Sequence, residues 1–76
     1  MAVTLYTTPT CAYCHKTKDY LRQRQVRFTE YNIASNRSKA DEMVRKSGQM
    51  GVPVVDINGR VIVGFNQAEI ERALHR

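Results

Sequence analysis

Short β-prone runs alternate with helical patterns along the chain, and the first two elements are a strand and a helix. Residues 3–7, Val-Thr-Leu-Tyr-Thr, are β-prone and stop at the Thr-Pro-Thr of residues 8–10, which predicts a strand followed by a loop. Residues 12–24 contain neither Gly nor Pro, and the buried-type positions between Cys14 and Leu21 recur on one helical face. This spacing predicts a helix of about three turns.

The next elements repeat this order. Residues 26–33 are predicted to form a second strand, whose imperfect alternation indicates a bulge or an early end near Glu30. Ser35 and Asn36 are suited to cap a helix, whose apolar spacing continues until Gly48, a residue typical of helix ends. Because a helix connects the first two strands, we expect them to be parallel with a right-handed crossover.

The last third of the chain predicts a hairpin and a closing helix. Residues 53–57 and 60–64 are two short strand patterns joined by Asn-Gly at 58–59, a pair typical of type I′ turns. Asn66 followed by Glu69 is typical of a capping box at the start of a final amphipathic helix. The order β-α-β-α-β-β-α predicts an α/β fold with a four-stranded mixed sheet and helices on both faces.

Composition and charge narrow the classes of function. A chain of 76 residues has no room for a second catalytic domain, so we expect one domain over residues 1–76. No run approaches the ~18–20 apolar residues of a membrane span, and the start of the chain lacks a signal-peptide pattern. We therefore expect a cytoplasmic protein with no membrane partner. The net charge is +5, but the basic residues are spread along the chain, which favours a solvated surface or an acidic protein partner over nucleic acid.

The cysteine pair carries the chemical signal. Cys11 and Cys14 lie where the first strand ends and the first helix begins. In a reducing compartment such a pair indicates catalysis or metal binding rather than a structural disulfide. The free N–H groups and the dipole of the first helical turn favour the thiolate of Cys11, which is therefore the expected nucleophile. Cys14, one turn further on the inner face, is expected to resolve the mixed disulfide, and the pattern predicts thiol–disulfide exchange.

Other uses of the same thiols remain open. Cys-Ala-Tyr-Cys-His also matches a c-type haem attachment motif, but that reading requires export and a largely helical surround. A zinc site needs about four ligands, and the candidates are Cys11, Cys14, His15 and His75. A dimer bridging an iron–sulfur cluster through Cys11 is a further alternative. Redox catalysis is favoured, with no metal and no bound cofactor.

A second signal precedes the third strand, at Gly51-Val52-Pro53. A cis Val52–Pro53 bond would leave the Val52 backbone free to pair with an extended substrate, whereas a trans proline that simply opens a strand is the commoner arrangement. Tyr13, an aromatic residue between the cysteines, is expected to contact substrate at a groove. Phe65 is expected either in the core or in the groove wall.

Taken together, these motifs resemble those of a glutaredoxin, within the thioredoxin-fold superfamily, over nearly the whole chain. The matching segments are residues 5–7, 10–14, 51–53 and 63–66. The resemblance implies that Cys11 attacks and Cys14 resolves. It also implies that a cis Val52–Pro53 bond faces Cys11, that the backbone at Val52 binds glutathione as co-substrate, and that Tyr13 walls the groove.

The chain also departs from the glutaredoxin pattern. Glutaredoxins usually carry Pro at the position of Ala12, and many carry Lys at the position of Thr8. Most have an Asp pair where this chain has Asn66 and Gln67. A lost charge-assisted contact of about 1.5–3 kcal/mol would weaken glutathione binding tenfold or more. Lys16 or Lys18 is expected to replace the missing charge in part at most, because both point along the helix.

Val-Gly-Phe at 63–65 resembles the Ser-Gly-Phe of redoxins that serve ribonucleotide reductase and take electrons from thioredoxin reductase. We therefore expect a monomeric dithiol–disulfide oxidoreductase of the glutaredoxin type, which reduces protein disulfides or glutathione mixed disulfides. A thioredoxin-reductase-dependent redoxin is the alternative within this class. An iron–sulfur or zinc binding module is the alternative outside it. The expected partners are glutathione, thioredoxin reductase or both, together with disulfide-containing proteins.

Overall fold

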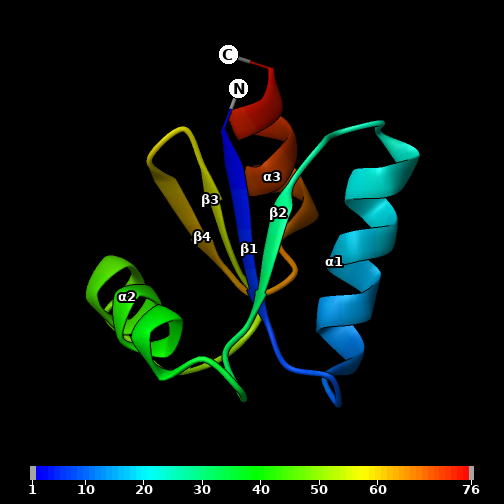
Figure 1. The fold of residues 1–76 in the computed structure, drawn as a ribbon. Helices are drawn as coiled ribbons and strands as arrows, with labels where there is room; N and C mark the ends of the chain where they lie inside the picture. The colour runs from blue at the N-terminus through cyan, green and yellow to red at the C-terminus, as the bar shows by residue number, and fades with distance from the viewer. Residues whose placement is uncertain (1, 76) are drawn as a thin grey trace.

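The computed structural model describes residues 2–75, which form seven elements in the expected order (Figure 1). The strands are β1 (Val3–Thr7), β2 (Thr29–Asn32), β3 (Val54–Ile57) and β4 (Arg60–Val63). The helices are α1 (Ala12–Gln23), α2 (Arg37–Ser47) and α3 (Gln67–Leu74). The strands make one sheet in the order β2-β1-β3-β4.

The sheet is mixed, as the sequence predicts. β1 pairs in parallel with β2 and antiparallel with β3, and β3 pairs antiparallel with β4. Asn58 and Gly59 in the turn between β3 and β4 have φ of 52° and 92°, the two positive values that a type I′ turn requires. The register places Tyr6, Val54 and Val63 side by side, so β1 and β4 end, and β3 begins, at the same end of the sheet.

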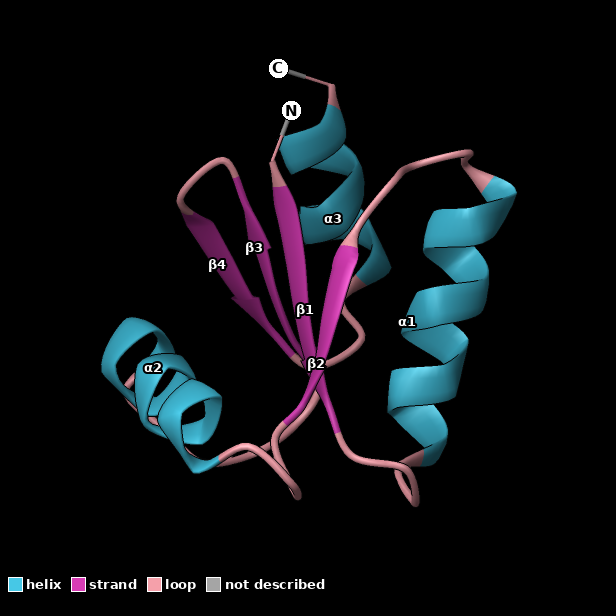
Figure 2. Cartoon of the chain, in the orientation of Figure 1, coloured by secondary structure: helices cyan, strands magenta, loops and turns pink. Residues whose placement is uncertain are grey.

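Helices cover both faces of the sheet and bury two sets of side chains. Figure 2 shows α1 and α3 on one side of the strands and α2 on the other. The strand alternation explains this, because Leu5 belongs to the core cluster that includes Leu21 and Ile70, whereas its neighbour Tyr6 belongs to the cluster that includes Met43. The three-layer arrangement and the α/β fold class are therefore confirmed.

The second strand is shorter than predicted, and it is shortened at its beginning rather than near Glu30. Gln25 adopts a left-handed φ of 57°, and Val26 N–H bonds Leu21 O at 2.9 Å. Together with the 2.9 Å bond from Gln25 N–H to Arg22 O, this is a Schellman motif that ends α1. Val26 and Phe28 still pack against the core, but from the connection and not from the strand.

The other helix ends agree closely with the local signals. Asn36 caps α2 by accepting from Lys39 N–H at 3.1 Å, and Gly48 closes it with φ 73°. Asn66 caps α3 by accepting from Glu69 N–H at 3.2 Å. The Glu69 carboxylate does not return this bond but pairs with two arginines, so only half of the capping box forms.

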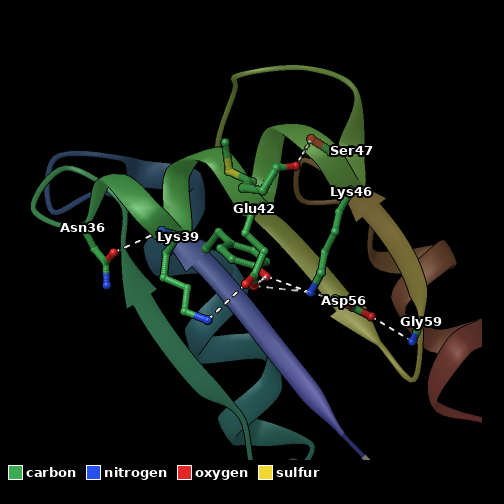
Figure 3. A network of polar contacts seen from close by, with 9 residues as sticks. Asn36, Lys39, Glu42, Lys46, Ser47, Asp56 and Gly59 are labelled. Carbon is green, nitrogen blue, oxygen red and sulfur yellow. Dashed lines mark hydrogen bonds and ion pairs between the residues drawn. The ribbon is translucent and has the colours of Figure 1, made fainter.

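A polar network ties α2 to the sheet (Figure 3). The buried Tyr6 hydroxyl donates to Glu42 and accepts from Lys46 Nζ at 2.8 Å. Lys46 also bonds Asp56 on β3 at 2.7 Å, and Lys39 bonds Glu42 at 3.1 Å. The hydrogen bond from Tyr6, followed by that from Lys39, lowers the pKa of Glu42 to about 2. The helix is therefore held by charged hydrogen bonds as well as by its apolar side chains.

Candidate functional site

The site is built around Cys11, which occupies the N-cap of α1 just beyond the end of β1. Its backbone is extended, with φ −94° and ψ 115°, and its Sγ accepts from Cys14 N–H at 3.1 Å. A cysteine thus fills the position at which Ser or Asp usually satisfies a free N–H of the first turn. This bond and the positive end of the helix dipole both stabilise a negative charge on sulfur.

Cys14 lies one turn further along α1 and is fully buried against the sheet, as the sequence predicts. Burial is the main cause that raises the pKa of Cys14 to about 12, and its hydrogen bond with Cys11 adds to this. Both cysteines are free in this structure. The pair therefore combines a half-buried sulfur that accepts an N–H bond with a buried thiol that keeps its proton at neutral pH.

The segment before β3 lies against Cys11. The Val52–Pro53 bond is cis, and Cys11 Sγ is 3.8 Å from Val52 O, to which the thiol can donate. Within residues 2–75, the Val52 N–H makes no hydrogen bond. The Val52 backbone can therefore pair with an extended ligand beside the sulfur. Pro53 O accepts from Gly64 N–H at 2.8 Å, which joins this segment to the chain that leads into α3.

The structure gives the remaining predicted groove residues different surroundings. Tyr13 is 59% exposed, and Lys16 Nζ lies 5.1 Å from its ring centroid. Thr8 contributes its backbone oxygen, which accepts from Cys11 N–H at 3.4 Å. Phe65 packs edge-on against Tyr20 with ring centroids 6.0 Å apart, so it belongs mainly to the core.

A shallow depression adjoins this part of the core. It has a volume of about 290 Å³ and lies between α1 and the start of α3. Phe65 and Gln67 line it together with Lys16, Asp19, Tyr20 and Gln23. The exposed part of Phe65 therefore serves as a wall of this depression. Asn66 does not line it, and its side-chain oxygen is used in capping α3.

Of the two lysines expected to compensate in part for the charge missing at Thr8, Lys18 pairs with the sheet and Lys16 lies over the Tyr13 ring. Lys18 Nζ pairs with Glu30 on β2 at 3.2 Å, and Glu30 also accepts from the Thr7 hydroxyl at 2.7 Å. Lys18 opposes the rise in the pKa of Cys14, but burial outweighs it. The groups that bond Cys11 Sγ are the backbone N–H of Cys14 and the carbonyl oxygen of Val52.

Sequence reasoning missed Met50, which precedes Val52 by two positions and is 81% exposed. The side-chain amide of the neighbouring Gln49 bonds both backbone groups of Gly51, and neither bond involves the Met50 side chain. The signal available in the sequence was a large apolar residue between Gln49 and Gly51, just before Val52 and Pro53.

The described residues contain neither a metal-binding cluster nor a membrane-spanning helix. Among residues 2–75, no three His, Cys, Asp or Glu side chains gather in a metal-binding arrangement. His15 lies 3.2 Å from Pro9 O, and His75 pairs with Glu71 at 3.0 Å, so neither is grouped with the cysteines as zinc binding would require. The same residues include no helix that is long and apolar enough to cross a membrane.

Comparison with known proteins agrees with this site. The glutaredoxin family profile matches residues 3–62. An uncharacterised glutaredoxin-like 8.6 kDa protein in the rubredoxin operon of Clostridium pasteurianum is 43% identical over 74 residues, covering 97% of this chain and 99% of that protein. Glutaredoxin 3 of Escherichia coli (strain K12) is 40% identical over 62 residues, covering 82% of this chain and 75% of that protein.

The fold gives an independent comparison. The structure of the glutaredoxin-like NrdH-redoxin from Escherichia coli matches with a TM-score of 0.82 at 32% identity, covering 95% of this chain and 93% of that one. The profile match includes both cysteines and the Val52–Pro53 segment that the fold brings beside Cys11. Sequence, topology and the arrangement of the thiols thus agree that this chain belongs to the glutaredoxin family and has a thioredoxin fold.

Proposed function

We propose that the chain is a dithiol–disulfide oxidoreductase that reduces protein disulfides or glutathione mixed disulfides. One observation carries the proposal. Cys11 Sγ accepts a helix N-terminal N–H at 3.1 Å and lies beside the Val52 backbone, whose N–H makes no hydrogen bond within residues 2–75. The sulfur is thus activated at a place where an extended disulfide substrate can be held.

The reaction proceeds by two exchanges. In the first, the Cys11 thiolate attacks a sulfur of the target disulfide, a bond forms between these two sulfurs, and the other target sulfur leaves as a thiolate. In the second, Cys14 gives up its proton, which the departed thiolate can take, and attacks Cys11. The target sulfur that was bound to Cys11 leaves as a thiolate, so the target holds one thiol and one thiolate, which can take a proton from water. Cys11 and Cys14 form a disulfide, and two electrons have passed to the target. A thiol donor must reduce the new disulfide before the next cycle.

Single replacements of the two cysteines test these roles. In Cys14→Ser, we expect transfer of glutathione to and from Cys11 to continue, because this step needs only the attacking sulfur. In Cys11→Ser, we expect all activity to be lost, since the buried Cys14 cannot meet a substrate. Mass spectrometry of the mixed disulfide and the rate of thiol release measure both outcomes. Activity that survives in Cys11→Ser would reverse the assignment.

A second candidate, a redoxin reduced by thioredoxin reductase, is supported by the charges that this chain lacks. Asn66 caps α3 with its side-chain oxygen, and neither it nor Gln67 or Thr8 offers glutathione an opposite charge. The NrdH-redoxin of Escherichia coli is described as having a thioredoxin-like activity profile. NADPH consumption with glutathione plus glutathione reductase, compared with consumption with thioredoxin reductase, identifies the donor.

The same preparation tests the remaining alternatives. We propose that the protein acts as a monomer in the cytoplasm, where reducing conditions keep the dithiol available. A freshly purified protein that is colourless, metal-free and fully active would exclude the iron–sulfur and zinc modules. A dimer on gel filtration that absorbs visible light, and that becomes a colourless monomer when the absorbance is lost, would instead support an iron–sulfur cluster held through Cys11.

A further inference from the structure

We propose that Met50 is a specificity contact that selects polypeptide disulfides with an apolar residue close to the reactive cysteine. The inference rests on the proposed exchange at Cys11 and narrows its substrate class. Glutathione has no large apolar side chain, so this contact favours a protein target over a glutathione mixed disulfide.

The first support is the location of exposed apolar surface. Within residues 2–75, the exposed large hydrophobic side chains are Tyr13, Met50 and Val63. Tyr13 lies between the two cysteines, and Met50 lies two positions before Val52, whose carbonyl oxygen is 3.8 Å from Cys11 Sγ. Two positions of chain span at most about 7 Å between Cα atoms. Apolar surface is therefore available on both segments that form the site.

The second support is the hydrogen bonding of the loop around Met50. Gln49 Nε2 donates to Gly51 O at 3.0 Å, and Gly51 N–H donates to Gln49 Oε1 at 2.6 Å. Gln49 Nε2 also reaches Ser47 Oγ at 3.2 Å, at the end of α2 seen in Figure 3. None of these bonds involves the Met50 side chain, which is 81% exposed.

Gly51 takes part in the same hydrogen bonds. A Cβ at this position would lie 2.8 Å from Gln49 Oε1, so a side chain here would displace the end of the Gln49 side chain. Glycine at position 51 thus leaves room for the bond from Gly51 N–H to Gln49 Oε1. The Gln49 side chain thus bonds the backbone of its own loop, and the loop exposes Met50. Methionine is an adaptable apolar side chain suited to varied partners.

Charge and backbone pairing identify the occupant as a polypeptide. Residues 8–16, 49–53 and 64–67 contain Lys16 and His15 but no Asp or Glu. These three segments therefore do not repel a neutral or acidic polypeptide. When an extended substrate chain pairs with the Val52 backbone, the substrate residues next to its reactive cysteine lie along residues 50–52 of this protein.

In the selected step, the Cys11 thiolate bonds to the cysteine sulfur of the polypeptide while the disulfide bond of that cysteine breaks and its partner sulfur leaves as a thiolate. We expect burial of Met50 against an apolar neighbour to favour this step by about tenfold, equivalent to 1.4 kcal/mol. Replacing the neighbour by a polar residue should remove the advantage.

The test compares two disulfide peptides that differ only in having Leu or Ser directly after the reactive cysteine. Fully reduced protein is mixed with each peptide in a single turnover, so no electron donor is needed, and formation of the Cys11–Cys14 disulfide is followed. We expect the wild type to prefer the Leu peptide about tenfold. Met50→Ser should bring the ratio close to one, whereas the matched Met50→Leu should keep it.

The outcomes separate this inference from the proposed function. A wild type that reacts with neither peptide would contradict the exchange activity, and the inference with it. A wild type that reacts with both peptides at the same rate, or a Met50→Ser variant that retains the preference, would overturn the inference alone. Equal slowing of both peptides by Met50→Ser would also overturn it. Circular dichroism and thermal unfolding check that each variant is folded.

Discussion

Two cysteines three positions apart acquire opposite properties from their surroundings. Cys11 lies in the N-cap, where its sulfur accepts a backbone N–H at 3.1 Å. Cys14 is fully buried, and burial raises its pKa to about 12. The first environment gives the sulfur a hydrogen-bond donor, and the second keeps the thiol protonated. The different tasks proposed for the two thiols follow from this difference.

Alkylation of Cys14 reports its environment directly. In reduced Cys11→Ser, we expect slow reaction with iodoacetamide at pH 8, because the buried thiol is protonated, and a rate that keeps rising as the pH is raised toward 12. In urea the same thiol should react as an ordinary cysteine with a pKa of about 8.5. Similar rates in the folded and unfolded protein at pH 8 would contradict the burial of Cys14.

The uncharged residues at the start of α3 make a second prediction at this scale. We expect Asn66→Asp combined with Gln67→Asp to lower the KM for glutathione by about tenfold, since each adds a charge for the ammonium group of the ligand. Asp caps a helix as well as Asn does, so α3 should remain intact. Steady-state kinetics with glutathione reductase measure the change.

A control separates local from general charge in that experiment. Asn58→Asp adds a carboxylate in the β3–β4 turn, at the opposite end of the sheet, where the side-chain oxygen can still accept from Ala2 N–H. Its KM for glutathione should match that of the wild type. If the double replacement leaves the KM equally unchanged, the glutathione groove does not lie at Asn66 and Gln67.

At the scale of elements, the helices end by local rules. Gly48 ends α2 with φ 73°, a conformation that costs glycine little. Gln25 ends α1 with φ 57°, although it carries a side chain, because the Schellman bonds of Gln25 and Val26 hold the backbone there. The same type of ending is thus made once with the favoured residue and once without it.

Exchanging these residue types should shift stability in opposite directions. We expect Gln25→Gly to raise the free energy of unfolding by up to about 1 kcal/mol, because it removes the side chain from a left-handed position. We expect Gly48→Ala, which introduces such a side chain, to lower the free energy by about 1 kcal/mol. Urea unfolding measures both changes, and changes of the same sign in the two variants would contradict this account of the helix ends.

The whole molecule consists of one sheet with a core on each face, and the smaller core depends on charged groups. Tyr6, Met43 and Val54 form its buried cluster beneath α2. The Tyr6 hydroxyl joins Glu42 and Lys46 above this cluster, so the helix and the centre of the sheet are held by groups that titrate (Figure 3). Acid should therefore loosen α2 from the sheet.

The lowered pKa of Glu42 sets the direction of this acid effect. A carboxyl group whose pKa is lower in the folded state stabilises the fold above its ordinary pKa of 4.5, and this contribution is lost as the pH falls through about 2. Tyr6→Phe removes the main cause of the shift. We expect it to cost about 1–2 kcal/mol at neutral pH and to flatten the loss of stability between pH 5 and pH 2. Urea unfolding at several pH values measures both effects.

Glu42→Gln provides the matched control for that measurement. It keeps a side chain that can accept from Tyr6 but cannot titrate, so its stability should also depend less on acid pH than that of the wild type. If all three proteins lose stability in parallel from pH 5 to pH 2, other carboxyl groups control the acid response.

Much of the site could be predicted because its signals are local. The N-cap position of Cys11, the inward direction of Cys14 and the caps at Asn36 and Gly48 each depend on a few neighbouring residues. The second strand could not be placed in the same way. Its apolar residues Val26 and Phe28 have the composition of a strand, but the Schellman ending of α1 and packing against the core hold them outside it.

The sequence by itself determined the order of elements, the hairpin turn, and the position of the reactive cysteine at a helix start, because hydrogen bonds and backbone angles within a few residues set these features. Only the tertiary structure decided which residues far apart in the chain meet. Cys11 and Val52 are 41 positions apart and Tyr6 and Glu42 are 36 apart, and each contact depends on strand register and helix packing. The exposure of Met50 is likewise a property of the folded loop that no residue pattern displays.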